Sequence, residues 1–152
     1  TSPYRPNENA RPSAIHGGEP ACSVNQATPS ISGTQITNVN RGGSLIQHMD
    51  APHREDAPVL VYMHEVDLGS RAAELGISTA SIESSCFHHQ EIARLGEGVE
   101  PIAHAASGNV EAVKYADLSW GYGVQWHPED NFETERGQLE LVEKFISVAA
   151  AR

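Results

Sequence analysis

The sequence has few basic residues and no long apolar run. Lys and Arg number 10 against 20 Asp and Glu, which gives a formal net charge of −10. This excess of negative charge opposes binding to the phosphates of nucleic acid or to anionic lipid. No apolar stretch approaches the length needed to cross a bilayer. The composition therefore predicts that neither nucleic acid nor a membrane is a partner.

Cysteine is also scarce. The two cysteines, Cys22 and Cys86, are too few for a disulfide scaffold. The start of the chain has no basic region followed by an apolar stretch, so the sequence predicts a cytoplasmic protein. The first residue is Thr1 rather than Met, which indicates a processed or incomplete product.

The sequence shows no signature of a bound cofactor. Its eight histidines are scattered without the spacing typical of a zinc site. A glycine-rich phosphate loop of the usual spacing is absent as well. We therefore predict no metal and no other cofactor.

The chain divides into two segments of different composition. Residues 1–32 are rich in proline and poor in large aliphatic side chains, which predicts an irregular segment. Residues 33–152 mix helix and strand patterns, which predicts one α/β domain. The expected elements are a helix over 32–41, a strand over 59–68, a short helix over 69–75, a strand over 80–87, one turn over 92–95, a hairpin of 102–105 with 110–115, a strand over 122–126 and a C-terminal helix.

The C-terminal helix has the clearest pattern. Its apolar residues recur at helical spacing and form one stripe, which we expect to pack on a sheet. The stripe consists of Leu139, Val142, Phe145, Ile146 and Ala149.

A histidine and a carboxylate follow the strand over 122–126. In extended backbone, positions two apart point to the same side, so His127 and Glu129 are expected to lie side by side. Pro128 between them fixes φ and ends the strand. A carboxylate that orients an imidazole forms the general-base half of a nucleophilic triad. The alternative is a strand-end histidine next to a surface charge.

Three strings in this chain resemble one family. Residues 123–130, Gly-Val-Gln-Trp-His-Pro-Glu-Asp, are similar to the triad signature of class I glutamine amidotransferases, especially the γ-glutamyl-γ-aminobutyrate hydrolase (peptidase C26) family. Residues 85–90 resemble the family's Ser-x-His-His-Gln segment, with Cys86 where a serine is usual. Residues 38–48 resemble the stretch after its nucleophile. The resemblance covers about residues 33–150, in the family's order.

The resemblance implies a fold. This is a three-layer, flavodoxin-like α/β fold with a mostly parallel sheet, whose N-terminal part is truncated or irregular here. Family members have roughly another strand-and-helix half before the nucleophile, with a Gly-Gly loop that contributes to the oxyanion hole. Only residues 15–18 faintly resemble that loop. We therefore expect a separate N-terminal half or a second copy of the chain to cover the sheet edge.

The resemblance also implies a function and a site. It predicts a hydrolase of γ-glutamyl amide bonds in small γ-glutamyl-amine conjugates, acting through a Cys-His-Glu mechanism. In that mechanism His127 is the base and Glu129 orients it. The substrate-binding residues would be Gln35, His88 and Gln90. For His88 and Gln90 the alternative is structural hydrogen bonding at a strand end.

The nucleophile is missing from its expected position. An ungapped alignment through Asn38 places Ile31 where the family has its cysteine, and isoleucine cannot attack a carbonyl. Cys22 is the weak candidate nucleophile, because its use requires an insertion before Gln35. Cys86 is expected to be a small buried residue.

The missing nucleophile leaves three interpretations open. In the first, the chain is an enzyme with a displaced cysteine. In the second, it is a catalytically inactive or truncated homologue that serves as a binding or interaction module. In the third, residues 1–32 are an incomplete or incorrectly translated version of the family's N-terminal half.

Overall fold

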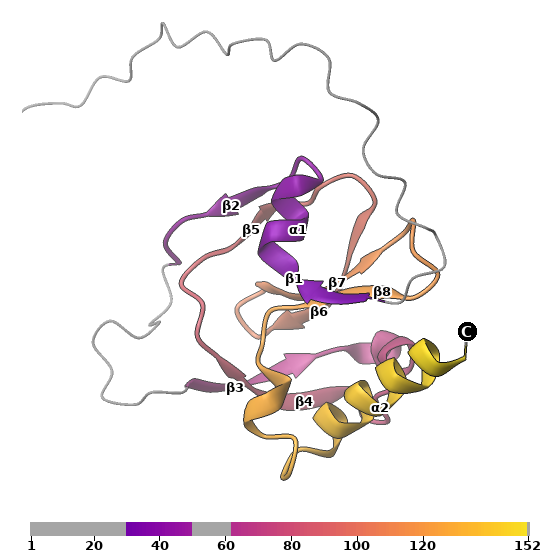
Figure 1. Cartoon of the computed structure of the whole chain (residues 1–152). Coiled ribbons are helices and arrows are strands. Elements are labelled where there is room, and N and C mark those ends of the chain that lie inside the picture. Colours follow the sequence, from indigo (N-terminus) through magenta and orange to yellow (C-terminus); the bar gives the residue numbers. More distant parts are fainter. Residues whose placement is uncertain (1–29, 50–61, 152) are drawn as a thin grey trace, which may run out of the picture.

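The protein is a layered α/β structure. The computed structural model describes residues 30–49 and 62–151. A six-stranded sheet in the order β1-β8-β7-β6-β3-β4 forms the middle layer, and β2 and β5 form a small second sheet. Helix α1 (Thr34–Asn40) and the small sheet lie over one face, and α2 (Arg136–Ala150) lies over the other (Figure 1). The strands are β1 (Ser30–Gly33), β2 (Ser44–Ile46), β3 (Tyr62–Asp67), β4 (Ser81–Cys86), β5 (Glu91–Arg94), β6 (Val99–Ala105), β7 (Val110–Tyr115) and β8 (Gly121–Val124), with 3-10 helices η1 (Gly69–Leu75) and η2 (Pro128–Asp130).

The strand pairing corrects the predicted mostly parallel sheet. Only β1 and β8 pair in parallel among the described strands, and β8–β7, β7–β6, β6–β3 and β3–β4 are antiparallel. For β6 and β7 the cause is their short connection: they form the expected hairpin, and a tight turn can join only antiparallel neighbours. Gly108 in that turn has φ of +90°, a conformation that favours glycine.

Most predicted elements agree with the structure. The helix over 32–41, the short helix over 69–75 and the strand over 80–87 correspond to α1, η1 and β4. The predicted irregular segment 1–32 lies outside the described residues, except for its last three positions, which begin β1. Of the strand predicted over 59–68, the described part contains β3.

The face that α2 buries differs from the prediction. Three members of the predicted stripe are exposed, namely Leu139 at 42%, Val142 at 40% and Ile146 at 58%. The buried residues include Leu141 and the polar Gln138. Gln138 accepts a hydrogen bond from the Trp126 indole at 2.9 Å inside the core. A buried polar contact therefore orients this helix, and hydrophobic periodicity alone could not show it.

Residues 92–94 of the segment over 92–95, expected as a turn, belong to strand β5, which pairs with β2. The buried Asn38 of α1 holds this small sheet: its Nδ2 donates to the Arg94 carbonyl at 3.0 Å, and its Oδ1 accepts from the Gly96 amide at 2.8 Å. A Cβ at Gly43 would collide with the Asn38 side chain. The Asn-x-x-x-Gly-Gly string is therefore a structural motif here.

Candidate active site

The end of β8 is fixed by contacts on two sides. Before His127, the Trp126 indole is held by α2 through Gln138. After His127, the Asp130 carboxylate lies 2.6 Å from the hydroxyl of the buried Ser85. The same hydroxyl lies 3.2 Å from the His127 carbonyl. The His127 amide donates to the Ser85 carbonyl at 3.2 Å. These contacts fix the backbone from which the His127 ring projects.

His127 and Glu129 form a hydrogen-bonded pair. The imidazole Nδ1 lies 2.9 Å from Glu129 Oε1, and the Phe87 ring packs edge-on against the imidazole at 4.9 Å between centroids. The hydrogen bond from His127 lowers the pKa of Glu129. The side chains are 42% and 67% exposed, so the pair adds little to folding stability. Its effect is to orient the ring and to leave Nε2 available for proton transfer.

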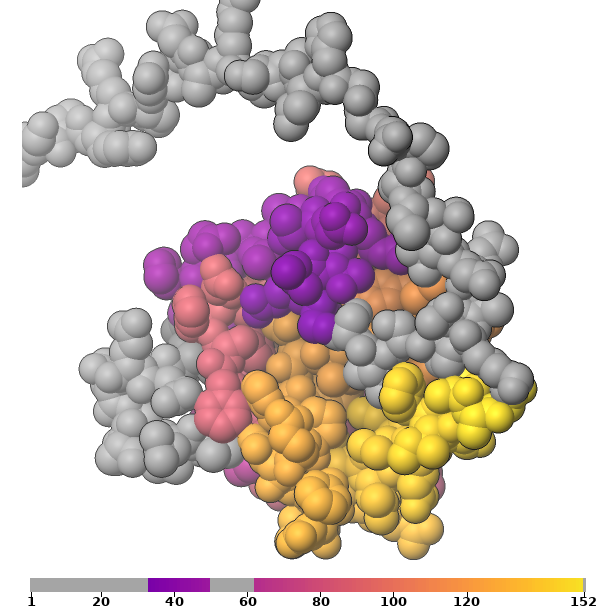
Figure 2. Space-filling model, in the orientation of Figure 1, coloured from indigo at the N-terminus to yellow at the C-terminus, as the bar shows by residue number. Residues whose placement is uncertain are grey.

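The pair lies on the wall of a cavity of about 800 Å³. The cavity opens where α1, the connection after β4 and the segment from β8 to η2 come together. Figure 2 shows these segments, coloured indigo, rose and orange, on one face of the molecule. The lining residues are Gly33, Thr34, Gln35, Ile36, Val39, Leu45, His88, Gln90, Val124, Gln125, Trp126, His127 and Glu129.

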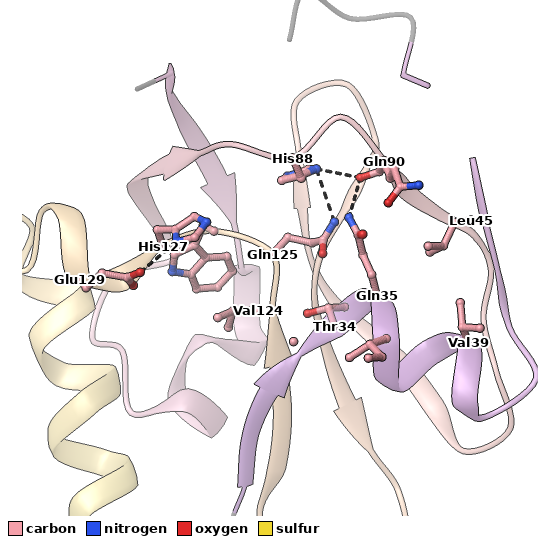
Figure 3. Close-up of a pocket in the computed structure, with 13 residues that line it drawn as sticks. Thr34, Gln35, Val39, Leu45, His88, Gln90, Val124, Gln125, His127 and Glu129 are labelled. Atoms are coloured by element: carbon pink, nitrogen blue, oxygen red, sulfur yellow. Dashed lines mark hydrogen bonds and ion pairs between the residues drawn. The ribbon is translucent and has the colours of Figure 1, made fainter. Parts of the chain in front are cut away.

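The three residues predicted to bind substrate line this cavity and bond to one another (Figure 3). The backbone carbonyl of Gln90 accepts from Gln35 Nε2 at 2.8 Å and from His88 Nδ1 at 2.9 Å. The side-chain amide of Gln90 donates to Gln47 Oε1 at 2.6 Å. The hydrogen bonds expected from a structural role of His88 and Gln90 are therefore present. All three residues also line the cavity.

Sequence reasoning missed several wall residues. Gln125 lies inside the string that carries His127, and its amide nitrogen is 3.5 Å from His88 Nδ1. Thr34 follows the glycine of the strand-to-helix turn, and its buried hydroxyl has no hydrogen-bond partner within residues 30–49 and 62–151. Both positions could have been found from their motifs, because they neighbour assigned residues.

No thiol lines the cavity in the part of the chain that the structure describes. Cys86 ends β4 and is fully buried, as expected, and Cys22 lies outside the described residues. Ile31 lies in β1, in register with Tyr122 of β8, directly before the turn into α1. The strand-to-helix turn is thus where the resemblance predicted it, and Ile31, which the alignment matches to the family's cysteine, lies in the strand before it.

The described residues contain neither a metal-binding cluster nor a membrane-spanning helix. Within them, no group of three or more His, Cys, Asp or Glu side chains could hold a metal ion. No helix in these residues is both long enough and apolar enough to cross a membrane.

Comparison with known sequences gives consistent matches. The model of the Peptidase C26 family matches residues 30–129. YvdE of Lactococcus lactis, named as a glutamine amidotransferase-like protein, is 33% identical over 76% of this chain and 50% of its own length. A protein of Mycobacterium tuberculosis named as a glutamine amidotransferase is 35% identical over 73% of this chain and 37% of its own. The chain thus spans half or less of the length of these relatives.

Solved structures show the same fold. A Thermoplasma acidophilum protein described as part of a GMP synthase matches 81% of this chain and 58% of its own length, with a TM-score of 0.63 and 20% identity. A glutamine amidotransferase of Methylobacillus flagellatus matches 82% and 45%, with a TM-score of 0.52 and 19% identity. The predicted α/β fold of the glutamine amidotransferase type is confirmed.

Proposed function

Because this chain belongs to the peptidase C26 family, we propose that its cavity is a γ-glutamyl site and that His127, oriented by Glu129, is the general base. The observation that carries the proposal is the 2.9 Å contact between these two side chains on the cavity wall. The ligand is a small γ-glutamyl-amine conjugate. Its amino and carboxylate groups would meet a wall rich in amide side chains, those of Gln35, Gln90 and Gln125.

Hydrolysis at such a site follows a thiol mechanism. His127 takes the proton of the thiol, the thiolate attacks the γ-carbonyl, and the amine leaves with the proton from His127. Water then attacks the thioester, with the same base, and glutamate is released. Cys22 is the thiol that we propose for this step.

A second candidate function is binding without hydrolysis. It is favoured by Ile31, which stands in β1 at the nucleophile position and has no reactive group. In this case the cavity and the His127–Glu129 pair persist as a ligand site. A separate N-terminal half or a second copy of the chain remains a proposal for the partner, and a cytoplasmic location remains a prediction.

One experiment separates the two functions. The purified chain is titrated with γ-glutamyl-γ-aminobutyrate by calorimetry and then assayed for glutamate release, beside His127→Ala and Cys22→Ala. Release that both substitutions abolish supports the hydrolase with Cys22 as its nucleophile. Saturable binding without release supports the binding function. Absence of both binding and release contradicts the γ-glutamyl site itself.

A further inference from the structure

A cluster of ionisable side chains lies behind the cavity wall. It consists of His88 on the wall, Glu111 of β7, Cys86 of β4 and His64 of β3. The Glu111 side chain is 1% exposed and the Cys86 residue is fully buried, while the His88 side chain is 12% exposed. Neither the proposed base nor the proposed nucleophile belongs to this cluster.

The contacts of His88 define its protonation. Its Nδ1 lies 2.9 Å from the Gln90 carbonyl oxygen, which can only accept, so Nδ1 carries a hydrogen. Its Nε2 lies 3.8 Å from Oε2 of Glu111. A buried carboxylate requires a compensating cation, and in the described residues His88 is the one side chain at ion-pair distance from Glu111. Apart from the Gln125 amide nitrogen, which lies farther from Nδ1 at 3.5 Å, the groups that the two ring nitrogens face favour protonation.

The pKa shifts of His88, Cys86 and His64 agree with this geometry. Burial lowers the pKa of His88, but the contacts with Cys86 and Glu111 outweigh it and raise the pKa to about 10. Burial raises the pKa of Cys86, but hydrogen bonds with His64 and His88 outweigh this and lower it to about 7. The hydrogen bond with Cys86 raises the pKa of His64. The shifts of His88 and Cys86 thus fit a cluster in which a protonated His88 faces Glu111.

The His88 ring is linked to the cavity wall through the backbone carbonyl of Gln90. The Gln90 carbonyl accepts from His88 and also from the Gln35 amide at 2.8 Å, so it joins α1 to the loop after β4. We propose that His88 is a positioning residue, held as an imidazolium by the buried Glu111, which fixes Gln35 on the cavity wall through the Gln90 carbonyl. The part that concerns ligand binding rests on the proposed γ-glutamyl site, whereas the protonation and the order of Gln35 do not.

The first test reads the protonation of His88 directly. Nitrogen-15 NMR of the imidazole is followed from about pH 5 to about pH 10 in the unmodified chain, Glu111→Gln, Glu111→Asp and the exposed control Glu133→Gln. We expect both nitrogens to stay protonated past about pH 8 in the unmodified chain and the control, with a midpoint lower by at least about one pH unit in Glu111→Gln and partly restored in Glu111→Asp. An ordinary midpoint near 6.5 in the unmodified chain overturns the inference, and this arm does not depend on any variant folding.

The second test reads Gln35. Its side-chain amide signals are expected to be sharp and shifted in the unmodified chain and to collapse toward those of free glutamine in Glu111→Gln. We also expect Glu111→Gln to weaken γ-glutamyl-γ-aminobutyrate binding about tenfold, with little further loss when Gln35→Ala is added, because both act through one contact. Unchanged Gln35 signals in Glu111→Gln overturn the positioning role. If the unmodified chain binds no γ-glutamyl ligand, the proposed function fails, and the NMR signals alone decide this inference.

Discussion

His127 Nδ1 and Glu129 Oε1 lie 2.9 Å apart across the single residue Pro128. Two features produce this contact. His127 follows three residues after the end of β8 and directly precedes η2, and the Ser85 hydroxyl, 2.6 Å from Asp130, supports η2. The contact is local in sequence but depends on packing from β4 and α2. It leads to a prediction that can be tested without an activity assay.

The first prediction concerns the tautomer of His127. Because Glu129 accepts from Nδ1–H, the neutral ring should carry its hydrogen mainly on Nδ1 in the unmodified chain. Glu129→Ala should shift the population toward the Nε2–H form, as read from imidazole nitrogen-15 shifts above the titration of the ring. Glu133→Ala, in the same acidic stretch, serves as the control. The same tautomer signals in Glu129→Ala and the unmodified chain would show that the pair does not orient the ring.

The second prediction tests which face of α2 is buried. Leu141 is fully buried, whereas Leu139 in the same helix is 42% exposed. Leu141→Ala should lower the free energy of unfolding by about 2–5 kcal/mol, because it opens a cavity in the core. Leu139→Ala should cost less than about 1 kcal/mol. Urea denaturation of both variants measures the difference, and equal losses would favour the stripe predicted from periodicity.

The third prediction concerns Gly43. An added Cβ would collide with the Asn38 side chain, which holds β2 and β5 together. Gly43→Ala should therefore reduce stability by about 1–3 kcal/mol. At Gly33 an added Cβ would meet its nearest atom, on Ile36, at an ordinary 3.7 Å, so Gly33→Ala is the matched control. Thermal unfolding that ranks the two variants in the opposite order would contradict the role assigned to Asn38.

The fourth prediction is a pH dependence. Hydrogen bonds from Lys114 and Arg71 lower the pKa of Glu74 to about 2, from an ordinary value of 4.5. A carboxylate with a lowered folded-state pKa stabilises the fold above its unfolded pKa and loses that effect as pH falls through the folded value. The stability advantage over Glu74→Gln, roughly 1–2 kcal/mol at neutral pH, should therefore shrink between pH 4.5 and 2.

Urea titrations at several pH values measure this difference. Glu133→Gln is the control, because that side chain is exposed. An advantage that stays constant from pH 6 to pH 2 would mean that the contacts of Glu74 with Lys114 and Arg71 do not stabilise the fold.

Local patterns were enough to predict much of the fold. Period-two and period-3.6 patterns with turn residues identified α1, β4, the β6–β7 hairpin and α2, because these elements are determined mainly by nearby residues. The side-by-side placement of His127 and Glu129 was predicted, but not its geometry: the prediction assumed extended backbone, whereas Glu129 lies in the 3-10 helix η2.

The features that the sequence could not predict depend on polar contacts between residues that are far apart in the chain. The buried face of α2 depends on Gln138 meeting Trp126, and strand β5 depends on Asn38 reaching Arg94. The pairing of His88 with Glu111 joins the loop after β4 to strand β7 and has no signature in local spacing. Buried polar side chains gain stability only when a distant partner is present, so periodicity does not reveal them.

The most direct measurement places a thiol at the nucleophile position. A Cys22→Ser, Ile31→Cys chain is incubated with a chloromethyl ketone built on the glutamine side chain, and S-alkylation at residue 31, with loss of chloride, is timed by mass spectrometry. The controls are the same chain with His127→Ala and a chain with a thiol at Ile146 instead, which is exposed on α2 and does not line the cavity.

If the cavity is a γ-glutamyl site and His127 its base, residue 31 should react at least about tenfold faster with His127 than without it. An excess of γ-glutamyl-γ-aminobutyrate should slow the reaction, and the thiol at position 146 should show neither effect. A rate at residue 31 that is independent of both His127 and the γ-glutamyl competitor would contradict the account.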